Sequence, residues 1–595
     1  MDGFTQPNIE EIAADWITAL DRAMYMHDRN ALRHLFASDS YWRNICGITW
    51  TFDTVSGLEK IIDALLARGV NANARNFELF TERHPPRLNT VGGEDVIEAV
   101  LRFETDIGVG IGVVRFKVEN PKISGQTVAW SLMTAIEQLD GHNYTPIQNE
   151  EDLNHNRSTE TGNWLDRRNQ ERNYDNKEPD VLIVGGGHAG LASAVELKQL
   201  GLDALVVDSM KRIGDNWRLR YHSLKLHNVT SVNHLPYMPF PKTFPRYIPK
   251  DKIANWLESY VEHMELNFWT EATFEGAEYD ENTEKWNARL RMSDGGTRLV
   301  CPAHIIMATS ISGTPKLPNI PTLDLFEGTV MHSSQLNNGS TWTGEKALVF
   351  GTGTSAHDIA QELYSNGVDV TMVQRSPTMV VNVEPSAQLY DGAYLDLSKR
   401  TEDLDLFNSS FPISLIKANH KLITAKVQKH DQPILEALEK KGFRLEFGEE
   451  NTGWPLKYRT RGGGYYFNAG CSDLIANGSI SLIQYHDIER FEAFGIKMRD
   501  GSSKLAHLAV LATGYHPPTY DLPKFYGQHV ADRVGTVWNV DPETQEINNM
   551  WVQTGQPGLW FTGGSFSQCR IYSKYLARQI LGVELGLLNK SLPSG

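Results

Sequence analysis

The chain has 595 residues, of which 41% are hydrophobic and 22% are charged, and its formal net charge is −16. This length exceeds what one hydrophobic core can serve and predicts several domains. The acidic balance argues against a nucleic-acid partner. No apolar run approaches the roughly 20 residues that cross a bilayer, so we expect no membrane span.

The amino terminus and the cysteines indicate a reducing compartment. The sequence MDGFTQPNIEEIAADW carries acids where a signal peptide would carry a basic stretch and then an apolar one. The four cysteines, Cys46, Cys301, Cys471 and Cys569, lie far apart without a CxxC pair. This spacing predicts buried, reduced thiols and no zinc or dithiol site. We therefore expect a cytoplasmic protein.

Residues 1–147 are predicted to form one α+β domain. Residues 9–36 place apolar side chains at helical spacing, and residues 57–69 indicate a second, shorter helix. Three segments with alternating or continuous apolar residues then predict strands of a curved antiparallel sheet, which wraps around the helices. These segments are 96–107, 110–119 and 127–139.

This arrangement resembles the NTF2-like (SnoaL-like) cone fold. The resemblance implies a domain that holds a ligand or an active site, or that offers only a partner surface. Asp39, Trp42 and Arg43 are candidates for lining a pocket of such a cone. A structural or shielding role is the interpretation that we rank first. The next segment, 148–178, is poor in aliphatic residues and predicts a linker, with Trp164 and Leu165 as its anchor.

A glycine-rich turn follows the linker. Val181–Val184 is a short apolar run, typical of a strand buried on both faces, and the pattern Gly185-x-Gly187-x-x-Gly190 comes next. The first glycine permits a tight turn, the second lets the backbone approach a pyrophosphate, and the third lets helix and strand pack closely. The helix that follows directs its positive end at the phosphates. Asp208 ends the second strand, where it can accept hydrogen bonds from ribose hydroxyls.

The same strand, turn, helix and strand recur later in the chain. The second turn is Gly351-x-Gly353-x-x-Ala356, and its second strand ends beside Arg375, where the first copy has Asp208. A guanidinium at this place suits the 2′-phosphate of NADP. We therefore predict FAD at the first unit and NADPH at the second. The fold class is α/β, with two Rossmann-like dinucleotide-binding domains preceded by an α+β cone domain.

Residues 180 to about 585 resemble the class B flavoprotein monooxygenases, specifically the flavin-containing monooxygenases and their YUCCA-like relatives. Five further motifs carry this resemblance: RIGDNWRLRYHSLKLH with Gly214, Asn216 and Trp217, then PYMPFP, then FEGTVMHSSQL with Phe326, Gly328 and His332, then LATGY at 511–515, and finally GLWFTGGSFSQCR. Three positions depart from the family pattern. Leu336 replaces an aromatic residue, Ala356 replaces a glycine, and Thr354 stands where many relatives carry asparagine.

The resemblance implies which residues contact the cofactors. Those of the first unit and its neighbouring segment are Gly185, Gly187, His188, Ala189, Gly190, Asp208, Asn216 and Trp217. Those of the second unit are Gly351, Gly353, Thr354, Ser355, Ala356 and Arg375, and Gly514 lies in the turn that joins the two nucleotide domains. We expect His188 to fill space in its turn and His332 to be structural.

The resemblance also implies an oxygenation with two cofactors. NADPH delivers hydride to FAD, the reduced flavin takes up O2 as a C4a-hydroperoxide, and one oxygen atom passes to a small-molecule substrate while the other leaves as water. Water must be excluded, because such a species otherwise decays to hydrogen peroxide. An asparagine near the flavin helps to preserve it in the family. Asn228 is our candidate for this catalytic role, and an amide that caps a loop is the alternative.

Several reactions stay open at this point. The family allows N- or S-oxygenation and oxidative decarboxylation of a 2-oxo acid, and by analogy we expect a role in secondary metabolism. Baeyer–Villiger insertion ranks lower, because its fingerprint has a different carboxy-terminal half. An uncoupled NADPH oxidase and a non-enzymatic binding protein are further alternatives. A flavin disulfide reductase needs a reactive cysteine pair, which this spacing lacks. A homodimer is left open.

The predicted domain order follows from these motifs. Residues 179–335 and 485–595 are expected to form the FAD-binding domain, and residues 336–484 the NADP-binding domain. Within the latter, residues 384–460 are predicted to face the substrate or to form a lid, because loop variation usually sets specificity. The glycines at 462–464 are predicted to be a hinge or a turn.

Overall fold

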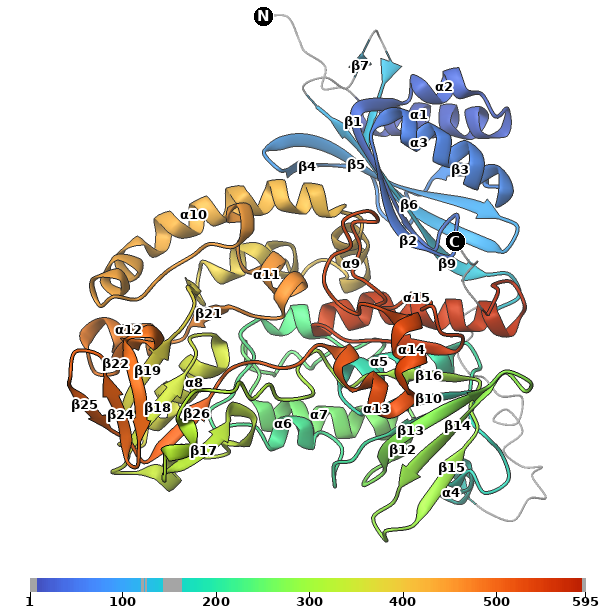
Figure 1. Cartoon of the computed structure of the whole chain (residues 1–595). Helices are drawn as coiled ribbons and strands as arrows, with labels where there is room; N and C mark the ends of the chain where they lie inside the picture. Colours follow the sequence, from blue (N-terminus) through green and yellow to red (C-terminus); the bar gives the residue numbers. More distant parts are fainter. Residues whose placement is uncertain (1–7, 119–121, 124–125, 143–162, 591–595) are drawn as a thin grey trace, which may run out of the picture.

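The computed structural model describes residues 8–118, 122–123, 126–142 and 163–590. Figure 1 shows a smaller N-terminal domain, drawn in blue, seated on a larger body that holds two parallel sheets. The first 15 residues of the predicted linker lie outside the described part of the chain. Among the described helices, none combines the length and the apolarity needed to cross a membrane.

The N-terminal domain begins with helices, but two strands precede its third helix, so the predicted order of helices first and strands afterwards is wrong at this point. Its helices are α1 (Ile9–Tyr25), α2 (Arg29–Arg33) and α3 (Leu58–Ala64). The single helix expected over 9–36 is wrong, because the Asp28 carboxylate accepts hydrogen bonds from the backbone N–H groups of Asn30 and Ala31 and so begins a new helix. The strands are β1 (Phe36–Ile45), β2 (Phe52–Ser56), β3 (Arg75–Leu79), β4 (Arg87–Val91), β5 (Glu94–Thr105), β6 (Gly108–Lys117) and β9 (Ala129–Leu139).

The three predicted strands are confirmed as β5, β6 and β9, but the sheet is mixed instead of antiparallel. Its order is β2-β1-β9-β6-β5-β3, with β4 also paired to β5. The pairs β5–β6 and β6–β9 are antiparallel, whereas β1 runs parallel to β9. Strands β1 and β9 are far apart in the sequence, so no hairpin pattern marked their pairing.

The two faces of this sheet bury different partners. Helices α1 to α3 cover one face, where Trp16 and Leu20 join a core with Phe103 and Phe116. The other face packs on the last helix, α15 (Phe566–Glu584), as Figure 1 shows. Ile45, Phe52 and Met133 belong there to the same hydrophobic cluster as Tyr575 and Leu576. The domain therefore shares a core with the rest of the chain and is not an independent appended unit.

The carboxy-terminal part of the predicted linker forms helix α4 (Trp164–Asn173). Its anchor is Arg168, which is 4% exposed and donates hydrogen bonds to the Asn267 side chain and the Glu265 carbonyl. The anchor expected at Trp164 and Leu165 is wrong, because these side chains are 50% and 51% exposed. Trp164 makes one polar contact, from its indole N–H to the Glu265 carboxylate.

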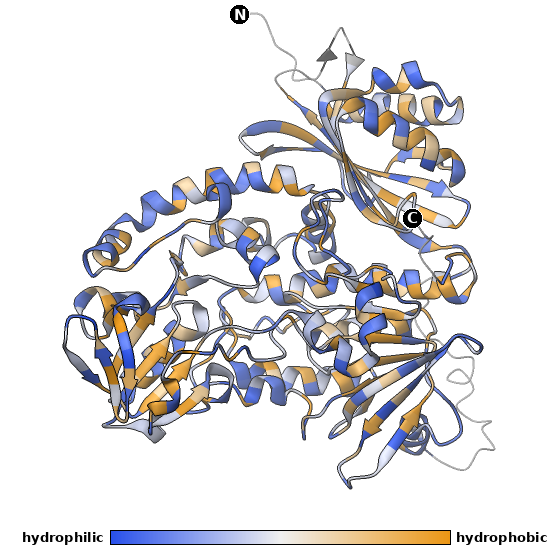
Figure 2. Cartoon of the chain, in the orientation of Figure 1, coloured by the Kyte–Doolittle hydropathy of each residue, from blue (hydrophilic) through white to orange (hydrophobic). Residues whose placement is uncertain are grey.

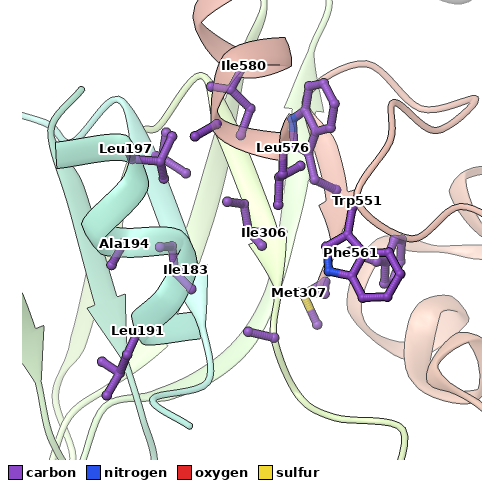
Figure 3. Close-up of a cluster of buried hydrophobic side chains, with 14 of the residues drawn as sticks. Ile183, Leu191, Ala194, Leu197, Ile306, Met307, Trp551, Phe561, Leu576 and Ile580 are labelled. Carbon is purple, nitrogen blue, oxygen red and sulfur yellow. The ribbon is translucent and has the colours of Figure 1, made fainter. Parts of the chain in front are cut away.

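The first parallel sheet has the order β12-β11-β10-β16-β27. These strands are β10 (Val181–Val184), β11 (Ala204–Val207), β12 (Asn267–Trp269), β16 (His304–Met307) and β27 (Leu559–Phe561). Helix α5 (His188–Gln199) follows β10. Figure 3 shows Leu191, Ala194 and Leu197 of this helix and Leu576 and Ile580 of α15 meeting the buried strand residues in one cluster. The predicted strand, turn, helix and strand are confirmed here.

The second parallel sheet has the order β17-β26-β18-β19-β22. Its strands are β17 (Thr329–His332), β18 (Lys346–Phe350), β19 (Asp369–Gln374), β22 (Ser481–Gln484) and β26 (Leu508–Leu511), and helix α8 (Thr354–Ser365) follows β18. In Figure 2 the strands of this sheet are largely orange, as expected of strands buried on both faces. The second strand, turn, helix and strand pattern is thus also confirmed.

Two segments lie in a different sheet from the one expected. We placed 329–332 and 508–511 in the FAD-binding domain, but β17 and β26 belong to the second sheet. Strand β26 pairs with β17 on one side and with β18 on the other. The fingerprint FEGTVMHSSQL and the motif LATGY are therefore parts of the second nucleotide fold.

The segment between β19 and β22 carries the predicted insertion. Its main elements are β20 (Met379–Asn382), η6 (Ala387–Leu395), α9 (Thr401–Ser409), α10 (Ile413–Lys440), α11 (Trp454–Arg461), β21 (Tyr465–Asn468) and α12 (Cys471–Asn477). In Figure 1 α10 runs along the top of the larger body, and its start lies beside the N-terminal domain. Smaller elements complete the fold: α6 (Asp215–Arg218), α7 (Lys250–His263), β13 (Thr273–Asp280), β14 (Lys285–Arg291), β15 (Thr297–Val300), β23 (Ile488–Glu492), β24 (Gly495–Met498), β25 (Ser503–Leu505), α13 (Leu522–Tyr526) and α14 (Gln528–Val534).

Candidate active site

The first glycine turn has the geometry of a phosphate cradle. Gly185 has φ +112°, and a Cβ there would lie 2.6 Å from the Ala308 carbonyl oxygen. At Gly190 a Cβ would lie 2.1 Å from the Gly185 carbonyl oxygen. Gly187 caps α5 without any side-chain hydrogen bond, so the first N–H groups of the helix have no side-chain acceptor. Such a helix start binds an anion, and we name residues 181–208 the first cradle.

Asp208 lies beside this turn at the end of β11. Its carboxylate accepts hydrogen bonds from the Gly186 N–H at 2.7 Å and the Met210 N–H at 2.9 Å, one on each oxygen. These bonds fix the carboxylate, and each oxygen keeps a second acceptor position. The arrangement suits the ribose hydroxyls of a dinucleotide.

Asn216, Trp217 and His188 surround the start of α5. The Asn216 side-chain nitrogen lies 3.1 Å from the Cβ position of Gly187. The His188 ring stacks on Phe566 with centroids 4.1 Å apart, and its Nε2 bonds to the Gly564 carbonyl at 2.9 Å. Burial lowers the pKa of His188, so the ring is neutral near pH 7. The carboxy-terminal segment thus holds His188 in the turn, in agreement with a space-filling role.

The second glycine turn repeats the first in its backbone. Gly351 has φ +113°, and a Cβ there would lie 2.5 Å from the Ala512 carbonyl oxygen. Gly353 caps α8 without a side-chain hydrogen bond. Thr354 is held by its hydroxyl, which donates to the Tyr465 carbonyl at 2.9 Å, and Ala356 is buried. We name residues 346–375 the second cradle.

Arg375 follows β19 at the outer end of the second cradle. Its side chain is exposed, and within the described residues its guanidinium has no ion pair. Arg444 donates a hydrogen bond to the Arg375 backbone carbonyl, so the Arg444 guanidinium lies at the main chain of Arg375. Two adjacent arginines are suited to a phosphate dianion. Arg444 was not predicted from the sequence, because it comes 69 residues later in the insertion and carries no local signal.

His332 lies at the end of β17 and Gly514 just after the end of β26, two neighbouring strands of the second sheet. Gly514 has φ +82°, and its carbonyl accepts hydrogen bonds from His332 Nε2 at 3.0 Å and from the Lys316 N–H at 3.0 Å. The other ring nitrogen of His332 lies 2.9 Å from the Ser334 hydroxyl. Both ring nitrogens are therefore engaged, which agrees with a structural histidine.

A cavity of about 620 Å³ lies between the two cradles. Five predicted site residues line it: His188, Trp217, Asn228, Thr354 and Ser355. The remaining predicted residues lie outside its lining, namely Gly185, Gly187, Ala189, Gly190, Asp208, Asn216, Gly351, Gly353, Ala356, Arg375 and Gly514. The fold thus brings the helix starts of both cradles to one cavity. The positions predicted to face the phosphates and the riboses do not line this cavity.

Asn228 is held at this cavity by a residue of the other nucleotide domain. Its side-chain N–H donates to the Asp391 carboxylate at 2.5 Å, and its backbone carbonyl accepts from the Asn233 side chain at 3.2 Å. Burial raises the pKa of Asp391 to about 6, while the hydrogen bond from Asn228 acts in the opposite direction. The amide is therefore positioned at the cavity, and its catalytic role stays a prediction.

The residues of the insertion give the cavity aromatic and cationic walls. Tyr390, Trp454 and Phe467 form an edge-to-face group, and Arg459 lies beside them without an ion pair among the described residues. Burial lowers the pKa of Arg459. Burial also lowers the pKa of His420 to about 3, and the positive charge of Arg459 acts in the same direction. A wall of this kind accepts an organic ring and an acidic or polar group.

Buried polar atoms without partners test whether a bound group fits here. Around the cavity, His188 Nδ1, Trp217 Nε1, His420 Nδ1 and Trp454 Nε1 are buried and make no hydrogen bond with the described residues. Most buried polar groups in proteins have a partner, so such a group points to a ligand or to water. Together with the two uncapped helix starts, the residues present fit a flavin dinucleotide and a nicotinamide dinucleotide.

The three residues predicted to line a pocket of the N-terminal domain have different surroundings in the structure. Trp42 is wrong as a pocket residue, because it lies in the domain core with its indole N–H on the Thr134 hydroxyl. Asp39 is exposed and pairs with Lys117. Arg43 does line a cavity, but this is the large cavity between the cradles and not a pocket inside its own domain.

Comparisons with known proteins agree with this geometry. Residues 182–391 match a family model described as pyridine nucleotide-disulphide oxidoreductase. The chain is 28% identical over 339 residues to the indole-3-pyruvate monooxygenase YUCCA1 of Oryza sativa subsp. japonica, covering 57% of this chain and 77% of that protein. It is 30% identical over 203 residues to the indole-3-pyruvate monooxygenase YUCCA6 of Arabidopsis thaliana, covering 34% and 48%.

From about residue 180 onward, the chain is related to the class B flavin monooxygenases. It is an oxidoreductase of the NADPH-dependent flavin monooxygenase kind. Among solved structures, cyclohexanone monooxygenase from Rhodococcus sp. Phi1 bound to NADP+ shares the fold with a TM-score of 0.50 and 16% identity, covering 68% of this chain and 85% of that one. The family model begins at residue 182, so the N-terminal mixed sheet lies outside that match.

Proposed function

We propose that this protein binds FAD in the first cradle and NADPH in the second, and transfers one oxygen atom of O2 to a small organic metabolite. When bound, the flavin reduced by NADPH supplies the chemistry that activates O2. The observation that carries the proposal is the cavity into which both helix starts lead, lined by His188 and Trp217 from one side and Thr354 and Ser355 from the other.

The residues of the chain have distinct tasks in this proposal. The glycine turns and helix starts bind the two pyrophosphates, Asp208 binds the flavin ribose, and Arg375 with Arg444 binds the 2′-phosphate of NADPH. Asn228, held by Asp391, presents an amide to the reacting centre. The aromatic wall of the insertion orients the substrate and excludes water.

For the substrate, we propose N- or S-oxygenation or the oxidative decarboxylation of a 2-oxo acid, within secondary metabolism. Arg459 favours the acid, because its guanidinium faces the cavity without an ion pair among the described residues. The relatives named above, which act on indole-3-pyruvate, support an aromatic 2-oxo acid as the first compound to test.

The test uses the FAD-loaded protein with NADPH, O2 and four probes: indole-3-pyruvate, methyl phenyl sulfide, N,N-dimethylaniline and cyclohexanone. If the proposal is correct, at least one of the first three probes gives close to one molecule of oxygenated product per NADPH consumed. A lactone from cyclohexanone as the main product would instead establish Baeyer–Villiger chemistry. Hydrogen peroxide as the only product with every probe would establish an oxidase, and a protein that binds no FAD would refute the proposal.

A further inference from the structure

The N-terminal domain contacts the insertion through buried arginines. Arg43 of β1 makes a two-pronged ion pair with Glu546 at 2.6 and 2.7 Å, and the two side chains are 7% and 9% exposed. The same guanidinium donates to the carbonyls of Ser409 and Phe411, the latter at 3.3 Å. One arginine thus ties β1 to the end of α9, to the loop before α10, and to the carboxy-terminal region.

A second buried arginine, on β6, contacts the same segment between α9 and α10. Arg115 of β6 is fully buried and pairs with Glu98 at 2.7 Å. It also donates to the Ser410 hydroxyl at 2.6 Å, and its guanidinium lies 3.9 Å from the centre of the Phe411 ring. Arg87 of β4 shares Glu98 and lies over the Phe407 ring at 3.6 Å. We name Arg43, Arg87 and Arg115 the arginine clamp.

The β4–β5 hairpin completes the contact on α10. A Cβ on Gly92 would lie 3.4 Å from the Ala418 Cβ, and one on Gly93 would lie 3.2 Å from Leu422, so the hairpin turn is seated against the helix. Val91 joins a small hydrophobic cluster with Leu415. The start of α10 is therefore enclosed by the N-terminal domain.

Gln545 adds a polar link between the same three regions. Its side-chain N–H donates to the Ser56 hydroxyl at 3.0 Å, and its side-chain oxygen accepts from the Ser414 hydroxyl at 2.9 Å. Beside it, the Thr54 N–H donates to the Thr544 carbonyl at 2.9 Å. Strand β2 is thereby bonded to the 541–547 segment and, through it, to α10.

These contacts surround the large cavity. On the side of the N-terminal domain it is lined by Arg43, Phe52, Asn89, Thr90 and Val91. The adjoining wall comes from the segment that the clamp holds: Asn408, Ser409, Phe411, Ile413, Leu415, Ile416 and Asn419. Asn89 and Thr90 are exposed and also line the cavity, so it reaches solvent beside this hairpin. The Arg43 guanidinium is occupied by Glu546 and two carbonyls, so its charge is paired inside the protein, and the wall mixes apolar side chains with neutral polar ones.

We propose that the N-terminal domain is a closing wall of the substrate cavity: the arginine clamp holds the start of α10 in place and keeps water out of the space beside the flavin. This inference rests on the proposed function, since it takes the cavity to be the place of oxygen transfer. Loss of the clamp then loosens residues 409–416 and diverts NADPH oxidation toward hydrogen peroxide, because water reaches the site.

The test removes both partners of one clamp pair, so that no buried charge is left alone. The variant is Arg43→Leu with Glu546→Leu. The matched control is Arg102→Leu with Glu78→Leu, an exposed ion pair of the same domain at 2.7 Å, with side chains 52% and 54% exposed. Gln545→Ala serves as a milder second variant that leaves every clamp pair intact.

Two readouts are compared. Hydrogen–deuterium exchange on the cofactor-free chain should become at least tenfold faster across 409–416 in the clamp variant and unchanged in the control. With FAD and NADPH, the share of NADPH that ends as hydrogen peroxide should rise at least twofold in the clamp variant, and in the same direction in Gln545→Ala.

Unchanged exchange across 409–416 in a folded clamp variant would overturn the inference. Faster exchange with an unchanged peroxide share would overturn it too, because the clamp would then serve stability alone. If the clamp variant does not fold, Gln545→Ala decides by the same two criteria. A failure of the proposed function would be separate, because the unmodified chain would then bind no FAD or oxidise no NADPH.

Discussion

The two cradles use the same backbone device and differ in what surrounds it. Gly185 and Gly351 have φ values of +112° and +113°, and each turn leads into a helix that lacks a side-chain cap. The first ends in a carboxylate, Asp208, fixed by two backbone N–H groups, whereas the second ends in Arg375 with Arg444 beside it. Under the proposed function, the shared turn would bind a pyrophosphate, and the residue after the second strand would select the dinucleotide.

The third position of each turn shows a second difference. A Cβ on Gly190 would lie 2.1 Å from the Gly185 carbonyl oxygen, a contact with backbone that cannot relax easily. At the corresponding place of the second cradle, Ala356 is 1% exposed, so its methyl group is accommodated. The first cradle is therefore the tighter of the two and should be the less tolerant of substitution.

The largest expected effect comes from substitutions at the third position of each turn, where each cradle receives the residue of the other. Gly190→Ala should weaken FAD binding at least a hundredfold, because the helix must move away from the turn, and such overpacking costs about 1–3 kcal/mol in stability as well. Ala356→Gly should change the dissociation constant of NADP+ by less than about threefold. Fluorescence titration with each cofactor measures both. Equal sensitivity at the two positions would break the comparison.

The next effect concerns the charge at the end of the second strand. Arg375→Ala should raise the dissociation constant of NADP+ about 10- to 100-fold, since a hydrogen bond to a charged group contributes about 1.5–3 kcal/mol. Binding of NAD+ should be unchanged, because it lacks the 2′-phosphate. Calorimetric titration of both nucleotides checks this. Arg490→Ala, an exposed arginine of β23, is the control and should affect neither.

The second cradle contains a buried histidine that should make the stability of the protein depend on pH. His357 in α8 is fully buried, stacks on Tyr466 with centroids 4.0 Å apart, and burial lowers its pKa to about 4. The unfolded chain binds this proton below about pH 6.5, so the contribution of His357 to stability is present above that pH and is lost as the pH falls toward 4. Between pH 7 and pH 5 the loss amounts to about 2 kcal/mol.

Replacing this histidine should therefore flatten the acid response. His357→Phe keeps a ring for stacking and removes the titrating group. When the pH is lowered from 7 to 5, the thermal unfolding midpoint of this variant should fall less than that of the original chain. If the two chains lose stability in parallel over this range, the neutral buried state assigned to His357 is wrong.

The smallest expected effect is at the first ribose position. Asp208→Asn keeps the shape but turns an N–H group toward one of the two backbone donors, which removes one hydrogen bond. FAD affinity should fall about fivefold, because the lost hydrogen bond contributes roughly 1 kcal/mol to the binding free energy, and NADP+ affinity should not change. Equilibrium dialysis with FAD measures the effect. A larger loss for NADP+ than for FAD would reverse the assignment of the two cradles.

The sequence was sufficient for the parts of the fold that have a local signature. Both strand, turn, helix and strand units, the helical start of the N-terminal domain and its strands β5, β6 and β9 could be predicted, because glycine spacing and apolar periodicity act within about thirty residues. The cavity residues Trp217 and Asn228 came from a resemblance in motifs, and the structure places both at one space.

The remainder depended on contacts between distant residues. Arg43 and Glu546 are 503 positions apart, and Arg444 lies 69 positions from Arg375, so neither pair leaves a pattern in the sequence. Strand β26 was assigned to the wrong sheet because a short apolar run carries no information on its neighbours. The parallel pairing of β1 with β9 was missed for the same reason.

The measurement that tests the central claim most directly is the anaerobic reduction of the purified, FAD-loaded chain by NADPH and, in parallel, by NADH. If the two cradles serve as described, the protein is yellow, NADPH bleaches it at least tenfold faster than NADH at equal concentration, and Arg375→Ala removes most of that preference. A chain that stays colourless after incubation with FAD, or one that both nucleotides bleach at the same rate, would contradict the account.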